Sequence, residues 1–174
     1  FFAVVNGMNG INFLASENLS VIVNQASFLV IVGIGQAIVI LTGGINLSMG
    51  AVMAFSSVLC GGMLLKESNM FIGVPIVLVL LTGAATGLLN GIMITKLNIP
   101  PFIATFAMMY TCRGLAWVYL RNRVLYPLNE SFRQIAMGRL FKIGGFTVTV
   151  PMLIAFLALL LFFWLLRFTN FGRK

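Results

Sequence analysis

The chain contains no histidine, three acidic residues and two cysteines among its 174 residues. Metal sites and general acid–base catalysis draw mainly on these residue types, so their scarcity argues against a metalloenzyme or an intramembrane protease. Cys60 and Cys112 lie in apolar stretches and predict neither a disulfide framework nor a metal site. The phosphate-loop pattern Gly-x-x-x-x-Gly-Lys-Ser/Thr is also missing, so we do not expect this chain to hydrolyse ATP. We predict no catalytic residue, no metal site and no cofactor on it.

Charged residues are also scarce, at 8% of the chain, whereas 60% is hydrophobic and the mean hydropathy is +1.08. That composition leaves too little polar surface to cover a soluble globule. Membrane β-barrels show alternating polarity, whereas this chain has unbroken apolar runs. We predict an all-α fold: a polytopic transmembrane helical bundle with about five spanning segments and one interfacial helix, at about 20 residues per span. Residues 1–174 are expected to form a single transmembrane domain.

The net charge of +8 raises the question whether the chain binds nucleic acid. The basic residues lie at the ends of apolar runs and in one loop, which is the usual pattern of membrane flanks. We therefore predict membrane lipid, and no nucleic acid, as a partner.

The apolar runs define the expected helices. An interfacial helix is predicted over residues 13–27, where apolar and polar residues alternate. Spans are predicted at 26–41, 49–65, 70–95, 101–120 and 143–166. Pro100 and Pro101 favour a helix start, because the missing N–H groups cost least there. Residues 121–142 form the long polar loop.

The link at residues 42–48 is the most informative segment. Its paired glycines free the backbone, while Thr42, Asn46 and Ser48 offer hydrogen-bond donors and acceptors at membrane depth. Irregular backbone is tolerated there only where it is buried in protein or lines a water-filled cavity. On these residues alone, a substrate pathway and an ordinary tight turn between two helices both remain open.

Other polar positions inside the predicted spans are further candidates. Asn90 either bonds across helices, which we favour, or faces a polar solute. Arg113 lies well inside its predicted span without an intramembrane carboxylate, so it is either a structural anchor or a pathway residue. Gln36 and Thr105 are plausible contacts for a solute, although such threonines often bond their own backbone. Helix packing is predicted at a repeat of small residues, Gly83, Gly87 and Gly91.

Five ordered blocks resemble the permease subunits of bacterial ABC importers for monosaccharides of the ribose, xylose and galactose type. The 43–50 block, Gly-Gly-Ile-Asn-Leu-Ser-Met-Gly, is similar to the family's Gly-Gly-Ile-Asp-Leu-Ser-x-Gly signature. The other blocks are 13–25, 87–105 with its Asn-Gly and Ile-Pro-Pro-Phe-Ile-Ala-Thr motifs, 113–114 and 169–173. Asn46 stands where the family commonly has Asp, which keeps hydrogen bonding but removes a charge.

The resemblance implies the transmembrane subunit of an ATP-driven importer in the bacterial cytoplasmic (inner) membrane, forming the pathway for ribose, xylose or galactose. ATP and Mg would bind to partner ATP-binding cassette subunits. Further implied partners are an extracytoplasmic sugar-binding protein and a second permease subunit, in a homo- or heterodimer. The chain would be the N-terminal part of such a permease, without its coupling region and later helices. The pathway candidates are Gln36, Thr42, Asn46, Ser48, Asn90, Thr105 and Arg113.

Two alternatives remain beside this function. One is a permease for another small solute, such as a furanosyl signalling molecule, and the other is a non-transport membrane assembly subunit. The resemblance also implies that Lys96 and the C-terminal end face the cytoplasm and that the 121–142 loop lies outside. That orientation puts four basic residues inside and six outside, against the usual excess of inside charge. The basic loop is either solvated or a contact for acidic lipid or the binding protein.

Overall fold

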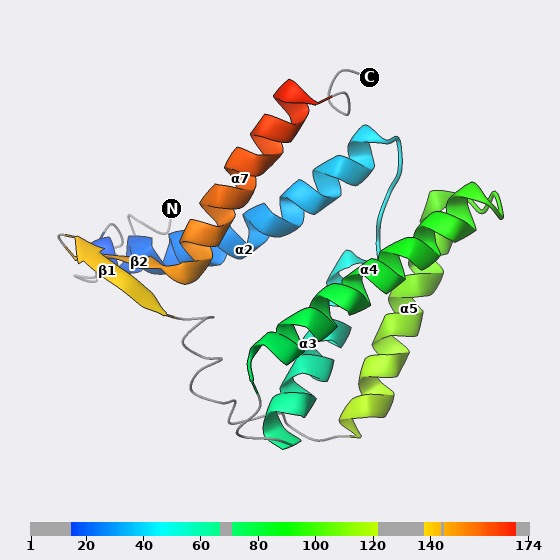
Figure 1. Cartoon of the computed structure of the whole chain (residues 1–174), viewed down its shortest axis with the longest axis horizontal. Coiled ribbons are helices and arrows are strands. Elements are labelled where there is room, and N and C mark those ends of the chain that lie inside the picture. The colour runs from blue at the N-terminus through cyan, green and yellow to red at the C-terminus, as the bar shows by residue number, and fades with distance from the viewer. Residues whose placement is uncertain (1–14, 67–70, 122–137, 144, 170–174) are drawn as a thin grey trace, which may run out of the picture. The chain divides into compact units, whose positions relative to one another are not determined.

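A computed structural model describes residues 15–66, 71–121, 138–143 and 145–169 (Figure 1). Most of these residues are helical, in α2 (Ser16–Leu41), α3 (Met49–Lys66), α4 (Gly73–Thr95), α5 (Pro101–Leu120) and α7 (Val150–Phe168). Strands β1 (Arg139–Ile143) and β2 (Phe146–Thr149) precede α7. The chain divides into two compact units, residues 1–35 with 133–174 and residues 36–132, which are described separately below.

Helix α2 runs unbroken for 26 residues, where the sequence predicted an interfacial helix and then a separate span. Its polar residues do not interrupt it. The hydroxyls of Ser20 and Ser27 each donate to the backbone carbonyl four residues earlier, at 2.7 and 2.8 Å. Because these hydrogen bonds satisfy the hydroxyls within the helix, the alternating polarity of 15–27 does not end the helix. The predicted boundary between two segments was therefore wrong.

Within the part of the chain that the structure describes, three helices, α2, α4 and α7, are long and apolar enough to cross a membrane. Helix α3 is a shorter apolar helix over Met49–Leu64. Helix α5 has the predicted bounds, with proline in its first turn, but it carries Arg113 and two threonines and does not reach the same apolar character. Length and composition thus support three of the five predicted crossings.

A two-stranded antiparallel sheet precedes α7 and corrects the all-α prediction. Lys142 of β1 pairs with Thr147 of β2, and Gly145 in the turn has a φ of +93°. Ile143 and residues 145–149, predicted to begin the last span, belong to this hairpin, so the helix begins at Val150 instead. The Gly-Gly pair at 144–145 followed by β-branched residues was the sequence signal for a hairpin.

The second unit is built on α3, which packs against both α4 and α5. Its core is formed largely by small side chains. Ala51 of α3 lies against Met108 and Cys112 of α5, all three of them buried, and Ala104 is 1% exposed. Small side chains let helix backbones approach closely, which is how membrane helices commonly associate. Both cysteines are free and buried in this unit.

The outward faces of the helices carry large apolar side chains. Leu29 of α2, Leu88 of α4 and Val118 of α5 are 73%, 66% and 72% exposed. Soluble monomers rarely expose contiguous apolar surface on this scale. The distribution of these side chains therefore agrees with helices that meet lipid or other helices.

The tight packing of α5 can be tested with paired substitutions at two alanines. Ala104→Leu inserts three carbon atoms at a buried position, so we expect the free energy of unfolding to fall by about 1–3 kcal/mol. Ala107→Leu, on an exposed face of the same helix, should change it by no more than about 0.5 kcal/mol. Thermal unfolding of the purified protein in detergent measures both. Equal melting temperatures for the two variants would contradict the packing described here.

A polar cavity as the candidate functional site

A cavity of about 400 Å³ lies within the second unit. Its walls come from the end of α2 and the loop that follows, from α4 and from the beginning of α5. The lining residues are Val39, Thr42, Gly43, Gly44, Ile45, Asn46, Gly87, Asn90, Gly91, Ile94, Thr95, Pro101 and Thr105. All of these side chains are uncharged, and the polar ones are threonines and asparagines.

The paired glycines shape one wall by ending α2. Gly43 has a φ of +75°, a left-handed conformation that glycine adopts without steric cost. The Gly43 and Gly44 N–H groups donate to the carbonyls of Ile40 and Val39, at 2.9 and 3.0 Å. This pair of hydrogen bonds is the Schellman motif, which satisfies the last carbonyls of a helix. The next two residues, Ile45 and Asn46, line the cavity.

A chain of hydrogen bonds links this loop to α4. The backbone N–H and the hydroxyl of Ser48 both donate to Asn46 Oδ1, at 2.9 and 2.8 Å. Asn90 Nδ2 in turn donates to Ser48 Oγ at 3.1 Å, across 42 residues of sequence. Ser48 is 1% exposed and Asn90 8%, so these bonds form in a buried setting where unpaired polar groups are costly.

The donors in this series of hydrogen bonds fix the orientation of the Asn46 and Asn90 amides. A backbone N–H can only donate, so the atom of Asn46 that faces Ser48 must be its oxygen. The Ser48 hydroxyl proton is also used toward Asn46, so Ser48 Oγ accepts from Asn90 and the NH₂ group must face it. That leaves Asn90 Oδ1, which is buried and has no hydrogen-bond partner among the described residues. Leaving such an acceptor unpaired costs about 1–3 kcal/mol.

The threonines of the cavity wall are largely satisfied by their own backbone. Thr42 Oγ1 donates to the Val39 carbonyl and Thr95 Oγ1 to the Gly91 carbonyl, at 2.8 and 2.7 Å. The Thr105 hydroxyl lies 2.8 Å from the Pro101 carbonyl and 3.2 Å from that of Ile45, so it also holds the loop beside α5. These hydroxyls keep lone pairs that can accept a further hydrogen bond.

Three glycines of α4 lie differently with respect to the cavity. Gly87 and Gly91 line it, whereas Gly83 does not. A Cβ atom built at any of the three would meet nothing within 4 Å. Within the described part of the chain, the small residues therefore leave open space on this face of α4.

The structure brings together most, but not all, of the candidate residues from the sequence. Thr42, Asn46, Asn90 and Thr105 line the cavity, and Ser48 lies directly behind it. Gln36 on α2 is half-buried and Arg113 on α5 is exposed, and neither lines the cavity.

Sequence reasoning did not identify Thr95 as a lining residue. It lies four residues after Gly91 on the same helix, and that spacing was the available signal, because residues four apart share a helix face. Nothing in the sequence marked Val39 and Ile94 as lining residues, since apolar residues occur throughout these helices.

Comparison with known proteins gives one family. Residues 18–174 match the family model described as branched-chain amino acid transport system / permease component. The chain is 36% identical over 167 residues to the ribose import permease protein of Bacillus subtilis, covering 94% of this chain and 49% of the relative. It is 35% identical over 153 residues to the galactofuranose transporter permease protein of Escherichia coli, covering 87% and 42%.

A third relative is the autoinducer 2 import system permease protein of Escherichia coli, 28% identical over 171 residues, covering 98% of this chain and 48% of the relative. The chain spans about half the length of the curated relatives it matches. No solved structure matches it.

The acceptor role of Asn46 predicts opposite outcomes for two substitutions. Asn46→Asp keeps an oxygen for both hydrogen bonds from Ser48 and places a negative charge near the beginning of α3, so we expect the unfolding free energy to stay within about 1 kcal/mol. Asn46→Leu removes the acceptor and should lower it by about 1–3 kcal/mol. Thermal unfolding in detergent distinguishes the two. An Asp variant as unstable as the Leu variant would show that the acceptor is not what holds the loop.

Proposed function

Because this chain belongs to the permease component family of branched-chain amino acid transport systems, we propose that it forms part of the translocation pathway of an ATP-driven importer. We propose a monosaccharide such as ribose, xylose or galactose as the solute. The observation that carries this proposal is the cavity itself, whose lining is uncharged and includes the polar side chains of Thr42, Asn46, Asn90 and Thr105.

The uncharged lining favours a neutral hydroxylated solute over an amino acid. An amino acid brings both an ammonium and a carboxylate, and such groups require opposite charges or several oriented hydrogen bonds when they leave water. A sugar hydroxyl both donates and accepts, so it can donate to the free lone pairs of the threonine hydroxyls in the wall, such as that of Thr42. The volume of about 400 Å³ lies within the usual range for small-molecule sites, about 300–1,000 Å³.

The hydrogen bonding of the cavity wall suits the passage of a solute rather than its retention. Thr42, Thr95 and Thr105 already donate to backbone carbonyls, so they offer a solute only weak acceptor contacts. A transport pathway needs binding that is favourable enough to admit the solute and weak enough to release it. Threonine hydroxyls that still accept but no longer donate meet both conditions.

The remaining parts of the assembly follow from this function. We propose that α2, α3, α4, α5 and α7 all cross the bacterial cytoplasmic membrane, with Lys96 on the cytoplasmic side. ATP and Mg would bind to separate ATP-binding cassette subunits, and an extracytoplasmic sugar-binding protein would deliver the solute to this chain paired with a second permease subunit. The names of the relatives, which are an import permease for ribose and a transporter permease for galactofuranose, support this arrangement.

A furanosyl signalling molecule is the second candidate solute, supported by the relative named for autoinducer 2 import. The relatives named for ribose and galactofuranose are more similar to this chain, at 36% and 35% identity against 28%. We therefore place the monosaccharide first.

The role of Asn90 can be tested by sugar uptake. Cells carrying the full-length gene with its ATPase and binding protein are given radiolabelled ribose, xylose or galactose. Asn90→Leu removes the polar side chain from the cavity lining, together with its hydrogen bond to Ser48, and should lower uptake by about tenfold, the effect of one lost hydrogen bond to a buried group. Thr111→Val is the control. It removes an exposed hydroxyl of α5 that donates to a backbone carbonyl of its own helix, so uptake should stay unchanged. An assembled complex that transports no sugar would overturn the monosaccharide assignment.

The space of the cavity can be tested separately from its polarity. Gly91→Leu places a side chain in the cavity from α4, and a Cβ atom at this position meets nothing within 4 Å, so we expect uptake to stop while membrane levels stay normal. Gly83→Leu is the matched control, since it lies on the same helix with equally open space but outside the cavity. Equal uptake by the two variants would show that the solute does not pass through this cavity.

A further inference from the structure

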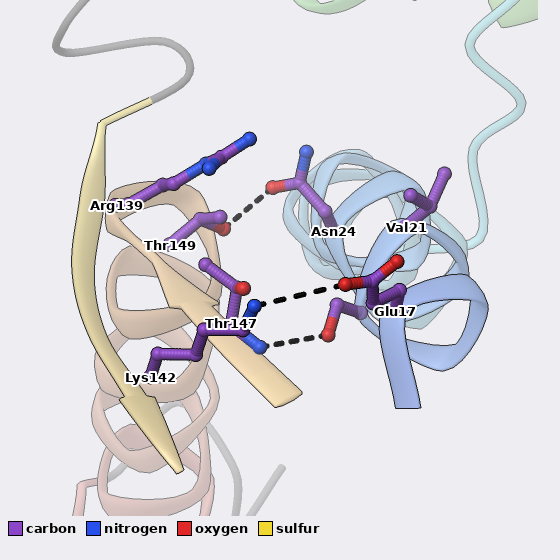
Figure 2. A pocket seen from close by; sticks show the side chains of 8 residues that line it. Glu17, Val21, Asn24, Arg139, Lys142, Thr147 and Thr149 are labelled. Carbon is purple, nitrogen blue, oxygen red and sulfur yellow. Dashed lines mark hydrogen bonds and ion pairs between the residues drawn. The ribbon is translucent and has the colours of Figure 1, made fainter. Parts of the chain in front are cut away.

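A second cavity, of about 430 Å³, lies in the first unit between α2 and the hairpin. Figure 2 shows that Glu17, Val21 and Asn24 of α2 form one side, while Arg139 and Lys142 of β1 and two threonines of β2 form the other. None of these residues belongs to the site described above. Unlike that site, this cavity is lined by charged side chains.

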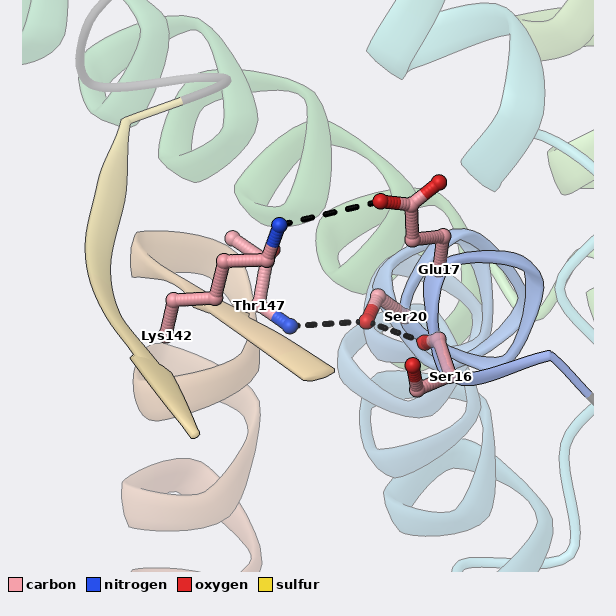
Figure 3. Close-up of polar contacts among 5 residues, drawn as sticks. All are labelled: Ser16, Glu17, Ser20, Lys142 and Thr147. Carbon is pink, nitrogen blue, oxygen red and sulfur yellow. Dashed lines mark hydrogen bonds and ion pairs between the residues drawn. The ribbon is translucent and has the colours of Figure 1, made fainter. Parts of the chain in front are cut away.

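Hydrogen bonds between α2 and β2 hold the two walls together. The Thr147 N–H donates to Ser20 Oγ at 2.8 Å, and the Ser20 hydroxyl donates in turn to the Ser16 carbonyl at 2.7 Å (Figure 3). The Thr149 hydroxyl donates to Asn24 Oδ1 at 2.6 Å. Ser20 and Thr149 are 7% and 9% exposed, so these contacts are buried. The cavity is therefore a formed site rather than a gap between independent segments.

The charges around the cavity favour an anion. Lys142 Nζ lies 3.6 Å from Glu17 Oε1, with side chains 59% and 80% exposed, and an ion pair so exposed to solvent is weak. Arg139 has no carboxylate partner within the described part of the chain, and its side chain extends from β1 toward Asn24 (Figure 2). Two cations face one anion, which leaves a net charge of +1. The amide NH₂ of Asn24 remains available as a further donor, because its hydrogen bond with Thr149 uses the oxygen.

Helix lengths place this cavity at the edge of a bilayer. Helix α7 has 19 residues, or about 28 Å, close to the ~30 Å thickness of the hydrocarbon layer. If α7 spans that layer, Thr149 just before it lies at the boundary with the headgroups. Asn24 is hydrogen-bonded to Thr149 and shares that level, and residues 24–41 of α2 then extend about 27 Å. The lengths of α2 and α7 therefore both place the cavity at the boundary between the hydrocarbon layer and the headgroups.

We propose that this cavity binds the phosphate of an anionic phospholipid headgroup. Arg139 provides a planar guanidinium that can hold two phosphate oxygens, and Lys142 turns from Glu17 to the phosphate. The position of the cavity beside two apolar helices favours a lipid over a soluble phosphate, since the acyl chains then lie along those helices. The proposal does not depend on which solute the second unit transports.

Lipid titration of the purified full-length protein in detergent, followed by native mass spectrometry, tests the proposal. Phosphatidylglycerol should bind more tightly than phosphatidylcholine, and Arg139→Gln should weaken phosphatidylglycerol binding by about tenfold, as expected for one lost charge-assisted pair. Arg167→Gln is the matched control: it removes the same charge from α7 of the same unit, outside the cavity. An equal loss in both variants would show diffuse surface attraction and overturn the site.

Glu17→Gln gives a test in the opposite direction. This substitution releases Lys142 and raises the net charge of the cavity, so phosphatidylglycerol should bind more tightly than to the wild type; weaker binding would contradict the proposal. Inorganic phosphate added in competition should not displace the lipid, and displacement at equal concentration would identify a soluble ion as the ligand. Displacement by a poly-glutamate peptide would point instead to an acidic protein partner. Unchanged elution profiles and far-UV spectra confirm that each variant is folded.

Discussion

The hydrogen-bond chain from Asn46 through Ser48 to Asn90 is the contact on which the second unit depends. It joins the irregular loop after α2 to the C-terminal part of α4, and it also fixes Ser48, the residue just before α3. Because each donor in this series of hydrogen bonds has a single partner, the orientations of the Asn46 and Asn90 amides are determined. The same bonds that hold the loop leave Asn90 Oδ1 without a partner. One side chain thus carries both a contact between helix and loop and a buried acceptor without a partner among the described residues.

Satisfaction of polar groups inside apolar helices explains the character of both cavities. In the helices, the hydroxyls of Ser20, Thr95 and Thr105 lie within hydrogen-bond distance of carbonyls of their own helix, because a polar group without a partner is expensive in an apolar medium. The cavity of the second unit is accordingly polar but uncharged. The cavity of the first unit carries Glu17, Arg139 and Lys142, and these charged groups occur only where two apolar helices begin. The cost of removing a charged group from water accounts for this difference between the two cavities.

Helix positions followed from the sequence where residues with strong backbone preferences mark the ends. Pro101 begins α5 and Gly43 terminates α2, as their fixed or permissive φ angles require. The hairpin before α7 was missed because its strands are short and adjoin an apolar run, so that residues 143–149 read as the beginning of the helix. The continuity of α2 was missed because back-bonded serines look like an interface pattern in sequence but remain compatible with a helix.

The sequence by itself determined that this chain is a helical membrane protein, which residues are polar within its apolar runs, and which family its ordered motifs resemble. These properties are local, since they depend on composition, spacing and the backbone preferences of single residues. Only the tertiary structure decided that Thr42, Asn46, Asn90 and Thr105 share one cavity while Gln36 and Arg113 lie elsewhere. It also decided that Arg139 and Lys142 meet α2 across more than a hundred residues of chain. Such contacts depend on how the helices pack, and hydrophobic patterning along one helix does not specify the packing partner.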